Sequence, residues 1–373
     1  MKLLVISHTE HYKDSQGAIV GWGPTITEIN HLLAIFEEIY HIAVLCDEKA
    51  PKSALPYTSN KIHFVPVKKV GGTTFSSKMN VLSQLPDVLK KVNSTLKLVD
   101  CFQFRAPTGM GVYLIPYLTL FVKKKGWFKY AGNWEQKKAP VAFAFQRWLL
   151  KNQHRKVTIN GQWAQQPSNC ISFENPCLTT QYREEGTFVI KDKSLERKLN
   201  FCFVGALNEG KGVDVILTAL EKIDSNRIGT FYFIGGGEQR PQYEAQGTTL
   251  NVTTKFEGFL PKEQINEVYK QCHFIVLPSK NEGFPKVIGE AMNYGCIPIV
   301  SDVSCIGQYI VDKKNGYLIA PLNAATLLSI FESCMDIEAP LFQEMMVANY
   351  QMSEKFTYDY YNKQLSAKIV TLE

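Results

Sequence analysis

The chain has 373 residues, of which 45% are hydrophobic and 20% charged, and its net charge is +6. This length exceeds what one hydrophobic core usually holds, so we expect two domains. No low-complexity tract occurs, and the longest apolar run, 111–122, is broken by Pro116. A low-complexity protein and a protein with a bilayer-spanning helix are therefore excluded.

The first half of the chain alternates apolar runs with polar loops. Residues 3–6 (LLVI) predict a buried strand, and a polar loop over 9–24, with Gly17, Gly21 and Gly23, leads into a helix predicted over 25–40. Six more strands are predicted here, at 41–46, 61–66, 99–104, 127–131, 156–159 and 170–173. These elements define a first domain, 1–178.

A polar and charged stretch over 179–198 follows, and it is the best candidate for a linker. Beyond it, strands are predicted at 200–205, 230–235, 253–258, 273–277 and 297–300. The alternation with helical patterns predicts an α/β fold of two Rossmann-like, doubly wound domains facing a central cleft, the second domain covering 199–355.

The most informative segment is NEGFPKVIGEAMNYGCIPIVSD, from residue 281 to 302. The run before it, 274–277, has no polar alternation and stops at Pro278, as a parallel strand buried on both faces would. Pro285 suits a first helical position, apolar residues then recur at helical spacing, and Gly295 ends the helix. The segment is one strand, loop, helix and strand unit.

Ligands of doubly wound sheets gather at the carboxyl ends of the strands, where Glu282 lies. Free N–H groups of Gly283, Phe284 and Lys286 at the helix start can hold a phosphate. Glu282 and Glu290, eight residues apart, suit hydrogen bonds from two different sets of hydroxyls. Two carboxylates that accept hydrogen bonds from hydroxyls, on either side of a diphosphate-binding turn, predict a sugar-nucleotide site.

The segment from about 199 to 318 resembles the retaining family-4 glycosyltransferases of the two-domain GT-B kind. The likeness rests on FVGALNEGKGVDVILTAL, FYFIGGGE, FEGFLPKEQINEVYKQCHFIVLPSKNEGFP and NGYLIAP, in the family's order and spacing. It implies a metal-independent, hexosyltransferase-like enzyme of polysaccharide or glycoconjugate biosynthesis that needs no cofactor. The acceptor would be a glycan or a lipid-linked molecule. It also implies that the last helix, over 356–373, packs back on the first domain.

The resemblance also implies roles for individual residues. Glu282 would contact the transferred sugar, Glu290 the ribose, and Lys211 the diphosphate. The remaining donor-binding candidates are Gly205, Gly258, Phe259, Leu260, Gly283, Phe284, Pro285 and Lys286. Glu282 and Lys211 are the catalytic candidates; Glu282 either orients the sugar or attacks it, and we favour orientation.

One departure from the family pattern concerns the phosphate contact. The family usually has arginine directly after the first glycine, and here Ala206 follows Gly205. A charge-assisted hydrogen bond contributes about 1.5 to 3 kcal/mol, so its loss weakens donor binding roughly ten- to a hundredfold. Either another cation substitutes, with Arg240 and Lys286 as candidates, or the diphosphate sits differently, or catalysis is reduced.

Two rival functions stay open at this point. Ala206 suits a non-catalytic sugar-nucleotide-binding partner subunit, and an epimerase can use the same two-domain scaffold. A dinucleotide-binding turn at Gly235-Gly236-Gly237 fails the G-x-G-x-x-G pattern, because Arg240 stands at the third glycine position. No D-x-D occurs and the seven histidines show no metal-ligand spacing, so no metal is expected.

The nine cysteines form no C-x-x-C pair, which predicts reduced core thiols and a cytoplasmic protein. Residues 121–156 hold ten Lys or Arg against one acid, Glu135, with aromatic residues between them. This basic-aromatic segment suits either peripheral contact with anionic lipid on the inner face of the cell membrane or a packed domain edge. No nucleic-acid-binding motif accompanies it, so we expect no nucleic acid partner.

Acceptor-binding candidates lie in the first domain. The glycine loop ends at Gly23, Arg105 follows a predicted strand, and Asn133 follows another in the segment KYAGNW. Glycine permits close approach of a ligand, and the other two supply polar groups at strand ends.

Overall fold

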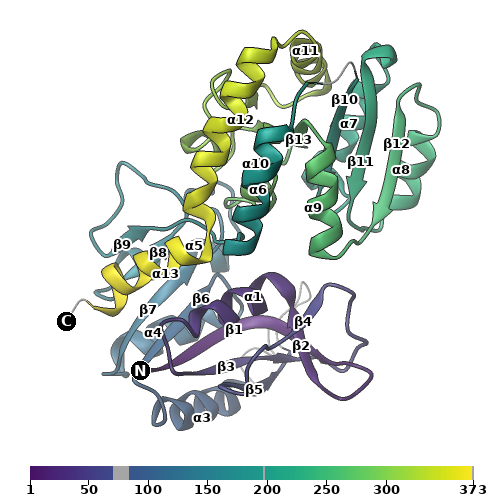
Figure 1. The fold of residues 1–373 in the computed structure, drawn as a ribbon. Coiled ribbons are helices and arrows are strands. Elements are labelled where there is room, and N and C mark those ends of the chain that lie inside the picture. The colour runs from purple at the N-terminus through teal and green to yellow at the C-terminus, as the bar shows by residue number, and fades with distance from the viewer. Residues whose placement is uncertain (70–83, 196–197, 372–373) are drawn as a thin grey trace. The chain divides into compact units, whose positions relative to one another are not determined.

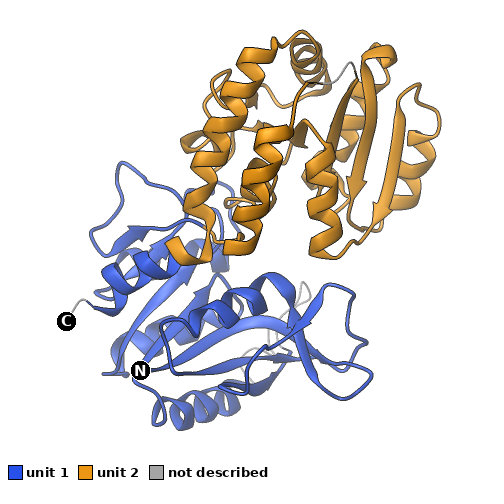
Figure 2. Ribbon diagram, in the orientation of Figure 1, with its two compact units in different colours: residues 1–174, 361–373 blue, residues 175–360 orange. Residues whose placement is uncertain are grey.

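The computed structural model describes residues 1–69, 84–195 and 198–371. The chain divides into two compact units, one of residues 1–174 with 361–373 and the other of residues 175–360 (Figure 2). Each unit is a parallel or mainly parallel sheet with helices around it (Figure 1). The predicted α/β class with two Rossmann-like halves is confirmed. Within the described ranges, no helix is both long and apolar enough to cross a membrane.

The first unit is built on a parallel sheet in the order β5, β3, β1, β6, β7, β8, β9, with β2 and β4 added antiparallel beside the far end of β1. The strands are β1 (Lys2–Lys13), β2 (Ile19–Trp22), β3 (Glu38–Leu45), β4 (Ala54–Pro56), β5 (Ile62–Lys68), β6 (Cys101–Ala106), β7 (Lys125–Tyr130), β8 (Val157–Ile159) and β9 (Cys170–Ser172). The helices are α1 (Gly23–Leu32), α3 (Leu85–Leu96), α4 (Gly111–Leu120) and α5 (Val141–Lys151).

Two expectations for the start of the chain were wrong. The loop predicted over 9–24 forms the end of β1 and the whole of β2, which pair as an antiparallel hairpin. The helix predicted to reach residue 40 ends at Leu32, because Ile39 and its neighbours extend β3, which is paired on both sides with β1 and β5. Tertiary pairing overrides a helical spacing that the sequence alone suggested.

The second unit has six parallel strands in the order β12, β11, β10, β13, β14, β15. The strands are β10 (Leu199–Val204), β11 (Ile228–Ile234), β12 (Thr253–Gly258), β13 (Phe274–Leu277), β14 (Ile297–Ser301) and β15 (Tyr317–Ile319). The helices are α6 (Thr180–Asp192), α7 (Val213–Leu220), α8 (Arg240–Gly247), α9 (Lys262–Gln271), α10 (Lys286–Asn293), α11 (Ala324–Met335) and α12 (Ala339–Ser353). The central strands β10 and β13 are almost wholly buried, as their continuous apolar runs predicted.

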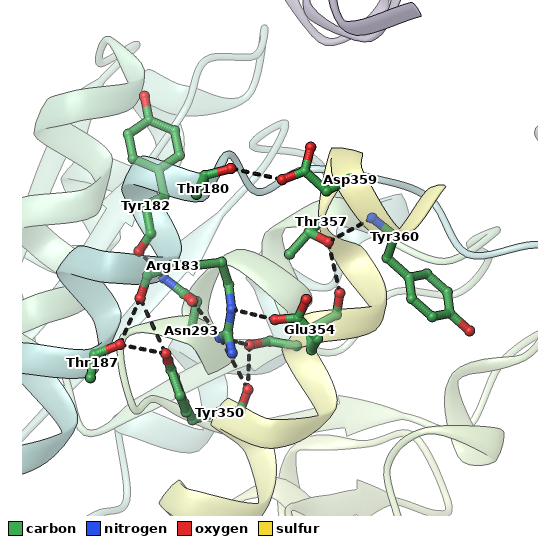
Figure 3. A network of polar contacts seen from close by, with 11 residues as sticks. Thr180, Tyr182, Arg183, Thr187, Asn293, Tyr350, Glu354, Thr357, Asp359 and Tyr360 are labelled. Atoms are coloured by element: carbon green, nitrogen blue, oxygen red, sulfur yellow. Dashed lines mark hydrogen bonds and ion pairs between the residues drawn. The ribbon is translucent and has the colours of Figure 1, made fainter. Parts of the chain in front are cut away.

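The stretch taken as a linker, 179–198, is instead mostly helix α6 of the second unit; its residues 196 and 197 lie outside the described ranges. Thr179 starts the helix by accepting a hydrogen bond from the N–H of Tyr182. Arg183 then donates to the Asn293 side chain at 2.8 Å and forms an ion pair with Glu354 at 3.1 Å (Figure 3). The segment is therefore part of the second unit, and Thr179 and Arg183 form hydrogen bonds within that unit.

The end of the chain passes from the second unit to the first. Helix α13 (Tyr358–Leu365) continues into a π-helical turn, Ser366–Val370, and residues from 361 onward belong to the first unit. Tyr361 and Leu365 are buried in the apolar cluster formed by one face of the first sheet with α1. Of the helix expected over 356–373, residues 372 and 373 lie outside the described ranges.

Candidate functional site

The strand order of the second unit creates a topological switch point between β10 and β13. From β10 the chain builds outward through β11 and β12, and then returns to add β13, β14 and β15 on the other side. The loops that follow β10 and β13 therefore leave the same edge of the sheet side by side, where ligands bind in open α/β sheets. Lys211 lies in the first loop and Glu282 in the second.

Backbone contacts hold these two loops together. The N–H of Lys280 donates to the carbonyl of Gly210 at 2.9 Å. Gly212 has a φ of +75°, and a Cβ atom there would lie 2.2 Å from the Pro278 carbonyl oxygen, so the turn requires glycine. The Asn208 side chain accepts from the N–H of Lys211 at 3.0 Å and closes a 3-10 turn. The NEGKG motif is thus a fixed turn seated on the end of β13.

This turn brings the two catalytic candidates into contact. The Lys211 ammonium forms an ion pair with the Glu282 carboxylate. The Glu282 side chain is 10% exposed and the Lys211 side chain 30%. The Lys211 ammonium is therefore partly exposed, and the Glu282 carboxylate behind it is mostly buried.

The Gly-Phe-Pro turn after Glu282 is anchored by its aromatic residue. Phe284 is buried and stacks on Phe356, with ring centroids 4.7 Å apart, and it also contacts the ring of Tyr309 at 4.8 Å. The Asn175 side-chain amide donates to the Phe284 carbonyl at 3.4 Å. The side chain of Phe284 therefore fixes the turn, and its backbone is the part that a ligand can approach.

Helix α10 begins at Lys286, directly after this turn, with Pro285 at the N-cap position. Two turns along the helix, Glu290 forms an ion pair with Lys262 at 2.5 Å and accepts a hydrogen bond from the Tyr269 hydroxyl at 3.3 Å. Burial, and then the negative charge of Glu290, raises the pKa of Tyr269, so this phenol stays a donor. The Glu290 carboxylate is therefore oriented before any ligand binds.

Lys262 is a site residue that the sequence reasoning missed. It is the first residue of α9, two positions after Leu260, and no local motif marks it. Its ion pair connects the loop after β12 with α10. The candidate base-contacting residues Gly258, Phe259 and Leu260 are thereby linked to the segment that carries Glu290.

The glycine-rich edge around Gly205 is closely packed. A Cβ atom at Gly235, whose φ is +135°, would lie 1.9 Å from the Gly205 carbonyl oxygen. Ala206 is exposed, so the missing arginine is a missing surface contact and not a core defect. Arg240 already donates to the Phe256 carbonyl at 2.9 Å and pairs with Glu244 at 2.7 Å. Both contacts lie on the β12 side of the sheet, so Arg240 is a poor substitute for that arginine.

The three acceptor candidates in the first unit occupy different surroundings. Gly23 opens α1, where a Cβ atom would lie 2.8 Å from the Ser53 carbonyl oxygen. The Asn133 side chain accepts from the N–H of Glu135 at 3.1 Å. Gly23 thus belongs to α1, Arg105 to β6, and Asn133 to the segment after β7.

Arg105 belongs to a buried ion cluster, which we call the Glu28 cluster: Glu28, Arg105 and Lys129. The Glu28 Oε1 atom accepts from Arg105 at 2.8 Å and from Lys129 at 2.5 Å. The Lys129 ammonium also lies 4.7 Å from the ring centre of Tyr361. Arg105 therefore links α1, β6 and β7, and its charge is already engaged inside the unit.

All nine cysteines are free and buried. Over the described part of the chain, no three His, Cys, Asp or Glu side chains are gathered as metal ligands. The expectation that the protein needs no metal stays a prediction.

Comparison with known proteins shows which proteins this chain is similar to. Residues 187–350 match the family model described as glycosyl transferases group 1. An uncharacterized glycosyltransferase of Methanocaldococcus jannaschii is 30% identical over 145 residues, which are 35% of this chain and 37% of that protein. A 2-deoxystreptamine glucosyltransferase of Streptomyces kanamyceticus is 27% identical over 157 residues, 41% of each chain. The match thus spans well under half the length of these relatives.

Solved structures extend the likeness to the whole chain. HepE of Anabaena in complex with UDP superposes with a TM-score of 0.72 at 14% identity, covering 100% of both chains. Sucrose-phosphate synthase of Thermosynechococcus elongatus gives a TM-score of 0.74 at 14% identity, covering 98% of both chains. The fold is GT-B. This confirms the predicted GT-B fold class.

Proposed function

We propose that the protein is a retaining glycosyltransferase that moves a sugar from a nucleotide-sugar donor to a glycan or lipid-linked acceptor. The observation that carries this proposal is the meeting of Lys211 and Glu282 at the switch point, with Glu290 on the helix that starts just behind. A diphosphate needs a cation and free N–H groups, and a sugar and a ribose need hydroxyl acceptors. The second unit places Lys211, Glu282 and Glu290 within two adjacent loops and one helix, which supports the proposal.

In the proposed reaction, the donor diphosphate takes over Lys211 from Glu282. The freed carboxylate then accepts hydrogen bonds from sugar hydroxyls and orients the anomeric carbon. The bond from that carbon to the leaving phosphate breaks through an oxocarbenium-like state, with the electron pair going to the diphosphate. The acceptor oxygen forms the new bond on the same face, and its proton goes to a phosphate oxygen.

Two residues support the nucleoside part of the donor. Glu290 accepts the ribose hydroxyls, and Lys262 with Tyr269 holds its carboxylate in place. We assign the role of offsetting Ala206 to Lys286, which stands at the first position of α10. Hexosyl transfer without a metal, in polysaccharide or glycoconjugate biosynthesis, is the reaction class we assign.

The direct test is a panel of nucleoside diphosphates and nucleotide sugars, screened by protection against thermal unfolding. A ligand that binds only the folded state raises stability with the logarithm of its concentration. UDP and UDP-glucose come first, because the structure of HepE has been solved with both. Protection by a nucleotide sugar, followed by release of its diphosphate and a glycosylated acceptor of retained configuration, is the expected outcome.

Ala206 favours one rival, a non-catalytic sugar-nucleotide-binding subunit, because it is exposed where a phosphate-binding arginine is usual. Tight diphosphate binding without cleavage of any nucleotide sugar would favour that rival. Product analysis tests the second rival, an epimerase. A changed free nucleotide sugar without a glycosylated acceptor would identify that activity.

A further inference from the structure

The structure divides the aromatic residues of segment 121–156 into two groups with opposite surroundings. Trp127, Phe128, Tyr130 and Trp134 are buried in the core of the first unit. For this group, the interpretation of the segment as a packed domain edge is correct. The other group lies on helix α5 (Figure 1) and needs a different explanation.

Helix α5 carries large apolar residues on its outer face as well as on its inner face, where Leu150 packs in the core. Val141, Phe145 and Trp148, at positions i, i+4 and i+7, share one face and are 86%, 40% and 58% exposed. The inner face also buries Gln146 completely, and its amide bonds both ways with the backbone of Thr108 at 3.1 and 2.8 Å. A helix that meets only water would place its large apolar residues on the inner face.

Two further apolar residues are exposed on the neighbouring helix, α4, which packs against α5. Leu120 and Phe121, at its end, are both more than two-thirds exposed. The Phe121 ring stacks on Tyr117, and the Phe145 ring stacks on Trp148, so the exposed rings are held in place by their own neighbours. We call Leu120, Phe121, Val141, Phe145 and Trp148 the apolar face.

Cations border this face on both helices. Lys123 and Lys125 follow α4, and Lys137 and Lys138 precede α5; all four side chains are exposed. The one acid of the segment, Glu135, is already paired with Lys151 at 3.2 Å. Exposed apolar side chains bordered by unopposed lysines are complementary to a surface that is anionic outside and apolar just below.

We propose that the apolar face docks on an anionic lipid bilayer, with Phe145 and Trp148 inserted at the headgroup boundary and the four lysines on the lipid phosphates. A protein partner would need its own acidic rim around an apolar patch, whereas an anionic bilayer offers both everywhere. The face is remote in sequence from the candidate donor site, so the inference does not rest on the proposed function.

The test is co-sedimentation of the full chain with vesicles of phosphatidylcholine alone or mixed equally with phosphatidylglycerol. Binding should be at least tenfold stronger to the anionic vesicles and should weaken as salt is raised. The double substitution Phe145→Ser with Trp148→Ser should lower it at least tenfold. Lys137→Glu with Lys138→Glu should lower it about 25-fold or more, because each cation near an anionic surface contributes about fivefold.

Two controls keep the result specific. Phe188→Ser, an exposed aromatic next to Lys191 in the second unit, should leave vesicle binding unchanged. Trp148→Phe should bind as the parent does, but lose most of the fluorescence quenching that brominated lipid causes in the parent. Equal binding to both vesicle types, or full binding by the Ser double variant, would overturn the proposal. Self-association abolished by that variant, without vesicle binding, would assign the face to a second copy of the chain.

Discussion

The two units carry polar side chains at the same edge of similar sheets and use them in opposite ways. In the second unit, Lys211 and Glu282 meet in a pair that solvent reaches. In the first unit, the Glu28 cluster lies at the carboxyl ends of β6 and β7, with Glu28 only 4% exposed. The comparison teaches that position at a sheet edge does not by itself keep a charge exposed: the Lys211 side chain is 30% exposed and the Lys129 side chain 8%.

The difference has a structural cause. In the first unit, α1 covers the polar edge from one side and the incoming residues of α13, led by Tyr361, cover it from another. In the second unit, the loops after β10 and β13 lie against each other and carry Lys211, which is 30% exposed, and Glu282. Substitutions should therefore affect stability in the first unit and ligand handling in the second.

The largest effect is expected from Glu28→Ala. Removing the shared carboxylate leaves Arg105 and Lys129 without the acid that balances them in a buried place, and breaking a buried pair costs about 3 to 5 kcal/mol. All five tryptophans lie in the first unit, so denaturant unfolding followed by tryptophan emission reports this unit.

The matched control is Asp87→Ala, which removes an exposed pair with Lys91 in the same unit and should cost about 0.5 kcal/mol or less. If the Glu28 and Asp87 variants unfolded at the same denaturant concentration, the cluster would have no special structural role.

The next effect is expected from Glu282→Ala, on turnover and not on folding. Loss of the group that orients the sugar should lower kcat about a hundredfold. Because the substitution also frees Lys211, the affinity for a nucleoside diphosphate should be unchanged or increased a few-fold. Steady-state kinetics and calorimetry on one preparation measure both quantities. A large loss of diphosphate affinity would show that Glu282 does not compete with the phosphate for Lys211.

A smaller effect is expected from Lys211→Ala and from Glu290→Ala. Each removes charge-assisted hydrogen bonds of about 1.5 to 3 kcal/mol, so nucleoside diphosphate affinity should fall roughly ten- to a hundredfold. The melting temperature without ligand should change little, because both side chains are part-exposed. Calorimetry with UDP as the first probe checks this, and Lys280→Ala, which breaks only an exposed pair with Glu209, is the control. Unaltered affinity in both site variants would contradict the donor placement.

The sequence predicted the parts of this site that lie within one segment. Glu282, the turn and Glu290 belong to one strand, loop and helix unit, whose periodicity is local. The sequence predicted that Lys211 and Glu282 contact the same ligand, but not that they form an ion pair with each other. The pair depends on the adjacency of β10 and β13, and local sequence patterns do not contain the strand order. Lys262 was missed for the same reason.

One prediction from composition was wrong and another stays a prediction, because composition does not show which residues a side chain contacts. Segment 179–198 is polar and was taken as a linker, yet Thr179 is a helix cap and Arg183 an internal anchor, signals that mean little until their partners are known. Arg105 was a reasonable ligand-binding cation from its strand-end position. Its acid, Glu28, lies 77 residues away in the sequence, and only the fold brings the two together.

The smallest expected effect is a difference between the two units in how their stability depends on pH. Two buried histidines of the first unit share one hydroxyl: His11 Nε2 lies 2.8 Å and His41 Nδ1 2.7 Å from the Tyr57 oxygen. Burial lowers the pKa of His11 to about 4 and the pKa of His41 well below its usual value. In the second unit, burial lowers the pKa of one histidine, His273, to about 4.

A histidine whose pKa is lower in the folded state binds fewer protons there than in the unfolded chain, so its contribution to stability falls as the pH drops from about 6.5 toward 4. Each such histidine should cost about 1 kcal/mol at pH 5.5. Burial also lowers the pKa of His8, so the first unit holds three such histidines, His8, His11 and His41, against one in the second unit, and it should unfold first. Tryptophan emission should therefore shift at a higher pH than the far-ultraviolet circular dichroism of the whole chain. His41→Gln should reduce the number of protons taken up when the first unit unfolds at low pH by about one. Coincident transitions of the two signals in the parent protein would contradict the difference between the units.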